Sequence, residues 1–229
     1  PVRDQQIDVR IDGRAARTTW RTTFFNPQPR DLEGTFLFTL PPGAQVSDFL
    51  IKIDGKELRG EVLERDKART IYENIVRRLR DPGLLEHIDD RTLRLKVFPL
   101  RARQESVVEI EYLQTLQRQH GLVVYEIQQT FPPGSEPPAN TSLNLDIVSG
   151  QPLGLIQSPT HNLDIEKENE GKKADVSLAG GERFRGNFAL FFETEAEDLS
   201  LHLLTYRWPG EETGTFLLIL NAPEQGVVA

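Results

Sequence analysis

The side chains that could carry out chemistry are scattered along this sequence. Its four histidines stand at positions 87, 120, 161 and 202, and no H-E-x-x-H pair places two of them on one helix face to hold zinc. Cysteine is absent, which excludes thiolate metal sites and a cysteine nucleophile. The sequence also lacks the G-x-S-x-G nucleophile elbow and the glycine-rich phosphate loops. We therefore expect a non-catalytic protein with no cofactor.

One acidic cluster is the best candidate for a metal site. Asp81, Glu86, Asp89 and Asp90, together with His87, fall within ten residues of one another. Carboxylate oxygens suit calcium, which takes six to eight oxygen ligands, but this spacing matches no EF-hand loop. A solvated acidic turn is the simpler interpretation.

Aromatic side chains could bind carbohydrate if they lie exposed on a sheet face. The candidates are Trp20, Tyr112, Tyr206 and Trp208. Trp20 alternates in register with Phe24, so a core position is the expected role for it. Carbohydrate binding remains the alternative to protein binding.

Composition and charge narrow the class of partner. The 229 residues are 38% hydrophobic and 27% charged, as in ordinary globular proteins, and the longest apolar stretch, 216–220, is too short to span a membrane. Residues 1–115 carry 20 Lys and Arg against 19 Asp and Glu, whereas residues 116–229 carry 7 against 16. An acidic second half disfavours nucleic acid, which requires a basic surface. The chain has no methionine and opens on a polar stretch, so we expect its ends to be boundaries within a longer protein.

Most of the chain alternates apolar and polar residues with the period of two that is typical of strands. Turn signals bound these segments, including Pro41-Pro42-Gly43, Asp54-Gly55 and a charged hairpin tip at 166–173. The predicted strands are 16–24, 36–40, 48–53, 91–98, 106–112, 143–148, 174–178, 187–192, 199–206 and 215–220. The pattern predicts an all-β protein, a β-sandwich of antiparallel strands followed by a second β-rich unit.

One segment has the period of an amphipathic helix instead. Its apolar stripe is Ala68, Ile71, Tyr72, Ile75, Val76 and Leu79, with Asp66 as N-cap and a stop at Asp81-Pro82-Gly83. The other face is basic and consists of Lys67, Arg69, Arg77, Arg78 and Arg80. Such a run is usually a solvated face, but it is also the candidate interaction face for an acidic protein partner.

Proline and glycine separate two units. Residues 131–139 (FPPGSEPPA) suit neither helix nor strand, and the charge balance changes sign near the same place. We predict a first domain at 1–132 and a β-rich extension at 133–229.

Several segments, read in order, resemble the VIT (vault protein, inter-α-trypsin inhibitor) domain. They are Phe25-Asn26-Pro27, Leu32 to Phe36, Leu40 to Val46, Ile53 to Lys56, Gly60 to Val62, Ala68-Arg69 with Tyr72-Glu73, Gly83 to Glu86, Val97 to Leu100 and Val108 to Tyr112. Within these segments we expect Glu33-Gly34 and Pro42-Gly43 to form turns and Gly55 to adopt a positive φ. None of the matching positions is a nucleophile or a metal ligand in that family.

The second half is similar to the stretch that precedes a von Willebrand factor A domain in such proteins. The matching residues are Leu199 to Arg207, Gly214 to Leu220 and Pro223, and no D-x-S-x-S metal motif occurs before Ala229. The resemblance implies a protein-interaction or scaffold module, like part of an inter-α-trypsin inhibitor heavy chain, that positions a downstream A domain in an adhesion protein. It also implies an extracytoplasmic protein, secreted or membrane-anchored, and the absence of cysteine fits a bacterial source. The oligomeric state and the identity of the partner stay open.

Overall fold

Strands make up most of the described part of the chain. The computed structural model describes residues 1–53, 55–59, 62–63, 83–87, 91–119, 121–129, 138, 140–180, 182–184, 186–194, 200–206, 213 and 215–221. At 58, 62–63, 83–87, 200–206 and 215–221 it describes only the backbone. The all-β class predicted from the sequence is confirmed. The predicted helix at 68–79 and the proline-rich connection at 131–139 lie outside the described residues, except Pro138.

The largest sheet, here the long sheet, joins strands from both ends of the sequence. Its order is β14 (Leu163–Glu168), β15 (Lys173–Leu178), β12 (Asn140–Val148), β1 (Val2–Asp12), β2 (Ala15–Phe25), β9 (Glu105–Thr115), β4 (Gln45–Ile53) and β5 (Lys56–Arg59). Its neighbouring strands are antiparallel except β1 and β12, which pair in parallel from Asp4↔Asn140 to Asp12↔Val148. The sheet therefore crosses the predicted boundary at residue 132, and the division into two domains remains a prediction.

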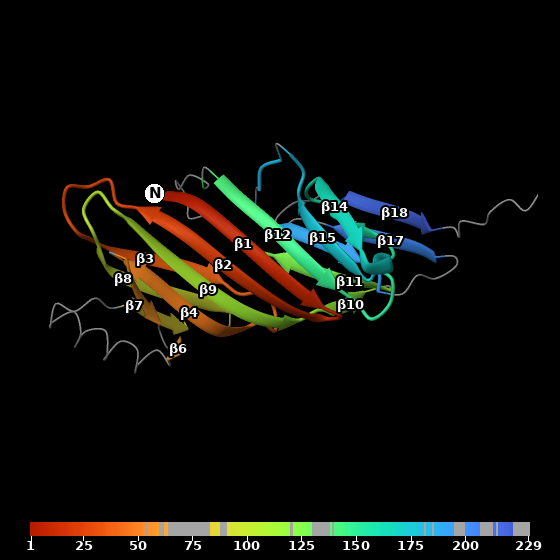
Figure 1. The fold of residues 1–229 in the computed structure, drawn as a ribbon, viewed down its shortest axis with the longest axis horizontal. Helices are drawn as coiled ribbons and strands as arrows, with labels where there is room; N and C mark the ends of the chain where they lie inside the picture. The colour runs from red at the N-terminus through yellow and green to blue at the C-terminus, as the bar shows by residue number, and fades with distance from the viewer. Residues whose placement is uncertain are drawn as a thin grey trace, which may run out of the picture.

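Two smaller sheets cover one face of the long sheet (Figure 1). The first cover sheet is β3 (Leu32–Thr39), β8 (Thr92–Leu100), β7 (Gly83–His87) and β6 (Val62–Leu63). The second cover sheet is β10 (Gln117–Gln119), β11 (Leu122–Ile127), β16 (Phe188–Phe192) and β13 (Ile156–Gln157). A separate hairpin pairs β17 (Ser200–Tyr206) with β18 (Thr215–Asn221).

Each cover sheet encloses its own core because alternate strand residues point to one face. Under the first, Phe49, Ile51 and Ile110 of the long sheet meet Leu93 and Leu95. The second core contains Ile7, Val9, Ile11, Leu143, Leu145 and Ile147 from the long sheet and Val123, Tyr125, Phe188, Leu190 and Phe192 from its cover. The sandwich thus consists of one long sheet with two covers side by side (Figure 1).

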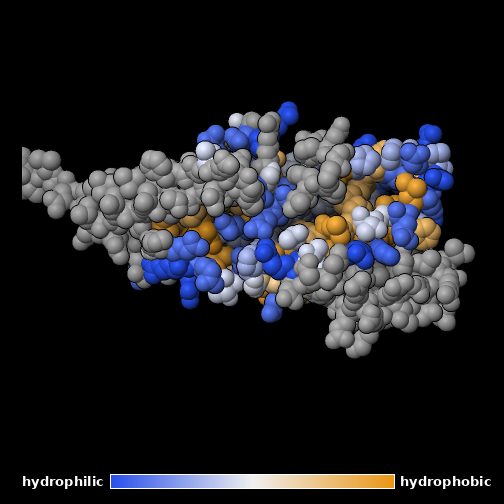
Figure 2. Space-filling view, turned by 180° about the vertical axis from the view of Figure 1, so that it is seen from behind, coloured by the Kyte–Doolittle hydropathy of each residue, from blue (hydrophilic) through white to orange (hydrophobic). Residues whose placement is uncertain are grey.

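Figure 2 shows the molecule from the side opposite to the view of Figure 1. Hydrophobic residues form separate orange patches between hydrophilic ones on this side. Leu37 of β3 is the most exposed large apolar side chain among the described residues, at 59%. Single exposed apolar residues of this kind are normal on a protein surface.

Most predicted turns are confirmed. Gly43 and Gly55 both adopt φ of +72°, and the pairing of Ile53 with Lys56 closes a two-residue hairpin. The charged hairpin is shorter at its tip than predicted, because Glu168 still pairs with Lys173 and the turn is the 3-10 segment η1 (Asn169–Gly171).

The turn predicted at Glu33-Gly34 is wrong. Both residues lie inside β3, where the register with β8 shifts between Leu32 and Gly34. A Cβ at Gly34 would lie 2.7 Å from Leu100 Cδ1 and 2.9 Å from Phe36 Cζ. A Cβ would require the Leu100 and Phe36 side chains to shift, so the glycine favours close packing at a β-bulge and does not reverse the chain.

Candidate functional site

The face of the long sheet away from the cores is polar and open. In β1, Asp8 and Arg10 alternate with buried Ile7, Val9 and Ile11, and in β12 Asn144 and Asp146 alternate with buried leucines. The period of two therefore assigns every second residue of these strands to this face. We call it the open face.

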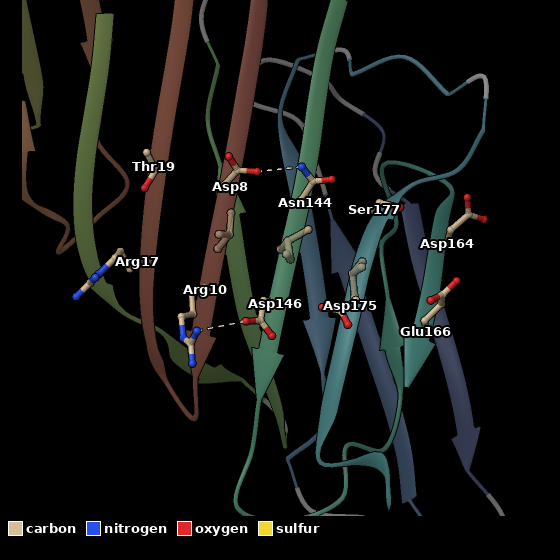
Figure 3. A pocket seen from close by; sticks show the side chains of 13 residues that line it. Asp8, Arg10, Arg17, Thr19, Asn144, Asp146, Asp164, Glu166, Asp175 and Ser177 are labelled. Atoms are coloured by element: carbon tan, nitrogen blue, oxygen red, sulfur yellow. Dashed lines mark hydrogen bonds and ion pairs between the residues drawn. The ribbon is translucent and has the colours of Figure 1, made fainter. Parts of the chain in front are cut away.

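A groove of about 600 Å³ lies on the open face across β2, β1, β12, β15 and β14. Figure 3 shows its polar side chains, which are Asp8, Arg10, Arg17, Thr19, Asn144, Asp146, Asp164, Glu166, Asp175 and Ser177. Five of these carry a carboxylate and two carry a guanidinium, so the groove has a net negative charge. A surface of this kind favours cationic partners.

A side-chain hydrogen bond and an ion pair join the neighbouring strands β1 and β12 in the groove. Asn144 Nδ2 donates to Asp8 Oδ1 at 2.9 Å, and Arg10 NH1 lies 3.6 Å from Asp146 Oδ2 (Figure 3). The other Asp146 oxygen, Oδ1, is buried without a hydrogen bond; Lys173 Nζ, at 4.0 Å, is within ion-pair range but beyond hydrogen-bonding distance. These contacts fix the side chains that line the middle of the groove.

Lys173 connects the acidic groups of β15 and β14. Its Nζ donates to Asp175 Oδ2 at 2.8 Å and to Glu168 Oε2 at 3.3 Å. The hydrogen bond to Asp175, and then that to Glu168, raises the pKa of the lysine above its ordinary value. Lys173 therefore stays charged and offsets part of the local negative charge.

Charges are balanced differently at the two ends of the open face. At the β2–β9 end, Arg21 NH2 lies 2.6 Å from Glu109 Oε2, and Arg17 Nε lies 3.9 Å from Glu111 Oε1. At the β14 end, Asp164 and Glu166 form no ion pair with the described residues. Among the described residues, the groove carboxylates without an ion pair are therefore Asp8 on β1 and Asp164 and Glu166 on β14.

A group of three buried hydroxyls lies beneath the sheet, where the two cores meet. Thr18 Oγ1 of β2 and Tyr125 OH of β11 are 2.7 Å apart, and both residues are fully buried. The Tyr112 hydroxyl interacts with both but makes no hydrogen bond of standard geometry. Burial raises the pKa of both tyrosines, that of Tyr125 well above its ordinary value. These groups are sealed from solvent, so we assign them a structural role.

Most of the site residues predicted from the sequence are not among those that the structure describes. The basic helix face, Lys67, Arg69, Arg77, Arg78 and Arg80, and the side chains of the acidic segment 81–90 lie outside the described residues. Among the residues that are described, no group of three or more His, Asp or Glu side chains could hold a metal ion.

Two of the four aromatic side chains are buried: the core position expected for Trp20 is confirmed, and Tyr112 is not available for carbohydrate binding. Trp20 is 5% exposed and Tyr112 is 1% exposed, because both point into the cores from the long sheet. The Trp20 ring instead packs edge-on against Phe38 at 5.1 Å between centroids. The side chains of Tyr206 and Trp208 lie outside the described residues.

The open face was not predicted, although the sequence contains a signal for it. The run Ile7 to Asp12 alternates perfectly between apolar and charged residues and marks a strand with one wet face. Its parallel pairing with β12, more than 130 residues away, has no comparable local signal.

The described residues thus form a β-sandwich with one polar, open face. The family model of the vault protein inter-alpha-trypsin domain matches residues 2–112. These residues are a VIT domain, as the sequence motifs predicted. The match contains the whole first cover sheet and its core, together with β1 and β2, and it ends within β9.

One curated relative is similar over most of the chain. The mouse (Mus musculus) protein mono-ADP-ribosyltransferase PARP4 is 23% identical over 211 residues, which cover 83% of this chain and 11% of that protein. The chain thus spans about a tenth of the length of this relative.

Similar solved structures include an M1 zinc metallopeptidase from Deinococcus radiodurans. It is 10% identical, with 99% of this chain and 48% of that chain covered and a TM-score of 0.45. A Legionella pneumophila protein with a proposed nutrient-binding role is 12% identical, with 82% and 66% covered and a TM-score of 0.43. At these TM-scores neither likeness bears on the function of this chain. No helix among the described residues is long and apolar enough to cross a membrane.

Proposed function

We propose that this chain is a non-catalytic protein-interaction module that positions a downstream von Willebrand factor A domain in an adhesion-type protein. The VIT domain at 2–112 supports the interaction role. The resemblance of residues 199–223 to the stretch before an A domain supports the positioning role. The mono-ADP-ribosyl transfer in the name of the mouse relative is not carried over, because the chain corresponds to only 11% of that protein.

The observation that carries the interaction role is the open face. A long sheet usually buries both faces or covers its outer face with solvated polar residues. Here the outer face combines a groove of about 600 Å³ with carboxylates that no described cation neutralises. Unbalanced charge on a broad, shallow surface steers and selects a protein partner of opposite charge. The extracytoplasmic location and the bacterial source remain predictions from the sequence.

The positioning role can be tested on the parent protein. We expect a D-x-S-x-S motif soon after Ala229 in the parent reading frame. The chain alone and the chain joined to that domain would then be compared by differential scanning calorimetry. Positioning predicts that the joined protein unfolds with a transition shifted from those of the separate pieces, because contacts between the two domains stabilise both.

An equimolar mixture of the two separate pieces is the matched control. At low micromolar concentration it should reproduce the sum of the two isolated transitions. The absence of the motif, or a joined protein whose transitions superimpose on those of the mixture, would remove the positioning role and leave an interaction module alone.

A further inference from the structure

The last strand of the long sheet has an open edge. β14 pairs with β15 on one side, from Leu163↔Leu178 to Glu168↔Lys173, and no described strand pairs with its other side. Residues 164 to 168 are all exposed. Figure 3 shows β14 at the margin of the groove, where it carries Asp164 and Glu166. An exposed edge of this length is a ready template for another strand.

The hydrogen-bonding pattern shows which amides face the open edge. Ala179 N donates to Asn162 O, and on the other side of β15 Ser149 N donates to Lys172 O. Hydrogen-bonded pairs alternate with non-bonded pairs along an antiparallel ladder. Both bonds therefore assign the even-numbered residues of β14 to hydrogen bonds with β15. Residues 164, 166 and 168 therefore bond to β15, whereas the N–H and C=O groups of Leu163, Ile165 and Lys167 point outward. The edge offers three donors and three acceptors in register.

The side chains of β14 give this edge a chemical preference. Asp164 and Glu166 point to the groove, opposite Ser177 and Asp175 of β15. Ile165 lies on the other face, opposite the buried Val176, and is 36% exposed. The edge is thus acidic on the open face, whereas its core face carries Ile165 and Lys167, whose Nζ donates to the backbone oxygens of Leu153 and Gly154.

We propose that the edge of β14 binds an extended basic segment of a protein partner, which adds a ninth strand to the long sheet. Lysine or arginine at alternate positions of that segment lies beside Asp164 and Glu166, and the intervening apolar residues lie beside Ile165. Cross-strand neighbours approach within about 5 Å, so opposite charges at these positions attract. This inference rests on the proposed interaction role.

The same charges disfavour a second copy of this chain as the partner. Two β14 edges related by a two-fold axis would place the carboxylates of one strand beside those of the other on the same face. Like charges directly opposite each other destabilise a strand pair. The edge therefore rejects itself and selects a cationic strand, which is a common way to limit edge-to-edge aggregation.

Peptide probes test the proposal on the intact chain. The probe is a capped seven-residue peptide that alternates lysine and valine, labelled for fluorescence anisotropy. One control peptide has glutamate in place of every lysine, and another carries N-methyl groups on the backbone amides that would pair with β14. We expect the lysine peptide to bind, the glutamate peptide to fail, and N-methylation to weaken binding about tenfold because it removes ladder hydrogen bonds.

Variants of β14 separate the charge from the edge. Glu166→Lys should weaken the lysine peptide about fivefold, and combining it with Asp164→Lys should transfer preference to the glutamate peptide. Ile165→Pro removes an outward donor but no bond to β15, so the sheet persists and binding falls. Ile165→Thr keeps the donor and is the matched control, and circular dichroism confirms that both variants stay folded.

Equal binding of the lysine and glutamate peptides would overturn the proposal, as would equal affinity of the Pro and Thr variants. If the peptide fails while the calorimetric coupling to the downstream domain persists, the edge is not the contact site and the proposed function stands. If peptide binding follows the predicted pattern without that coupling, the edge inference stands and the positioning role falls.

Discussion

Two buried tyrosines that lie close together, Tyr112 and Tyr125, should differ in how the loss of the hydroxyl group changes the free energy of unfolding. Tyr125 OH lies 2.7 Å from Thr18 Oγ1, so Tyr125→Phe leaves the buried threonine oxygen without that partner. An unsatisfied buried polar group costs about 1 to 3 kcal/mol. Tyr112 OH interacts with Thr18 and Tyr125 but makes no hydrogen bond of standard geometry, so Tyr112→Phe removes weaker interactions than Tyr125→Phe does. We expect that variant to lose less stability.

Urea unfolding measured by tryptophan fluorescence gives the free energy of unfolding for each variant. For a chain of 229 residues, the loss expected for Tyr125→Phe corresponds to a fall in Tm of about 2 to 4 °C per kcal/mol. The m-value must stay constant for the comparison to measure stability. Tyr112→Phe is the matched control, because it removes the same atom from an equally buried ring.

A double-mutant cycle with Thr18→Val isolates the hydrogen bond itself. When both partners become apolar, no unsatisfied group remains, so the double variant should lose less than the sum of the two single variants. The expected coupling is about 1 kcal/mol. Additive losses, or a Tyr112→Phe variant as unstable as Tyr125→Phe, would refute the reasoning.

Tyr125 should also lower the stability of the chain at alkaline pH. Burial raises the pKa of Tyr125 well above 10.0 in the folded state. The unfolded chain therefore loses this proton first as pH rises past 10, and the free energy of unfolding should fall above that pH. The fall should be shallower in Tyr125→Phe, as unfolding curves at pH 9 to 11 will show; identical slopes would contradict the assignment.

Three further predictions concern other parts of the fold. Asn26→Asp should destabilise the chain by about 1 to 3 kcal/mol, because the buried Nδ2 donates to two backbone carbonyls and a carboxylate cannot donate. Chemical denaturation measures this loss, and an unchanged denaturation midpoint would contradict it. Burial lowers the pKa of His161 below 6.5, so on acidification the unfolded chain binds a proton before the folded chain does, and the free energy of unfolding should fall below that pH. Between pH 6.5 and 5, His161→Phe should lose less stability than the parent. Parallel plots of the free energy of unfolding against pH for the two proteins would count against this. Gly34→Ala should cost about 1 to 3 kcal/mol by overpacking, whereas Gly150→Ala, where a Cβ would meet no atom within 4 Å, should cost much less; equal losses would show that the bulge can relax.

Many strand positions were predictable because they depend on local alternation, although β1, β11 and β14 were not among the predicted strands. In β2, the buried residues Ala16, Thr18, Trp20 and Thr22 are those that the period of two assigned to one face. The glycine turns at 43 and 55 were predictable for a similar reason, since a positive φ is a property of the residue itself. The VIT motifs gave the family for the same part of the chain.

The bulge at Gly34 shows where local reasoning fails. A glycine beside a polar residue suits a turn, but the same glycine also suits a strand where a Cβ would require Leu100 and Phe36 to shift. Only the packing of β8 against β3 distinguishes the two. The burial of Tyr112 is a similar case, since a period of two shows that a residue shares a face with its neighbours but not which face is covered.

The sequence by itself determined many of the strands, most of their turns and the class of fold, because each follows from nearest-neighbour chemistry, and its motifs gave the resemblance to the VIT domain. The tertiary structure decided that β1 pairs with β12, which unites the two halves of the chain in one sheet. It also decided that β14 lies at the edge and that the carboxylates of β12, β15 and β14 gather in one groove. These features depend on contacts between residues far apart in the chain, and strand pairing at long range leaves no periodic signal in either partner.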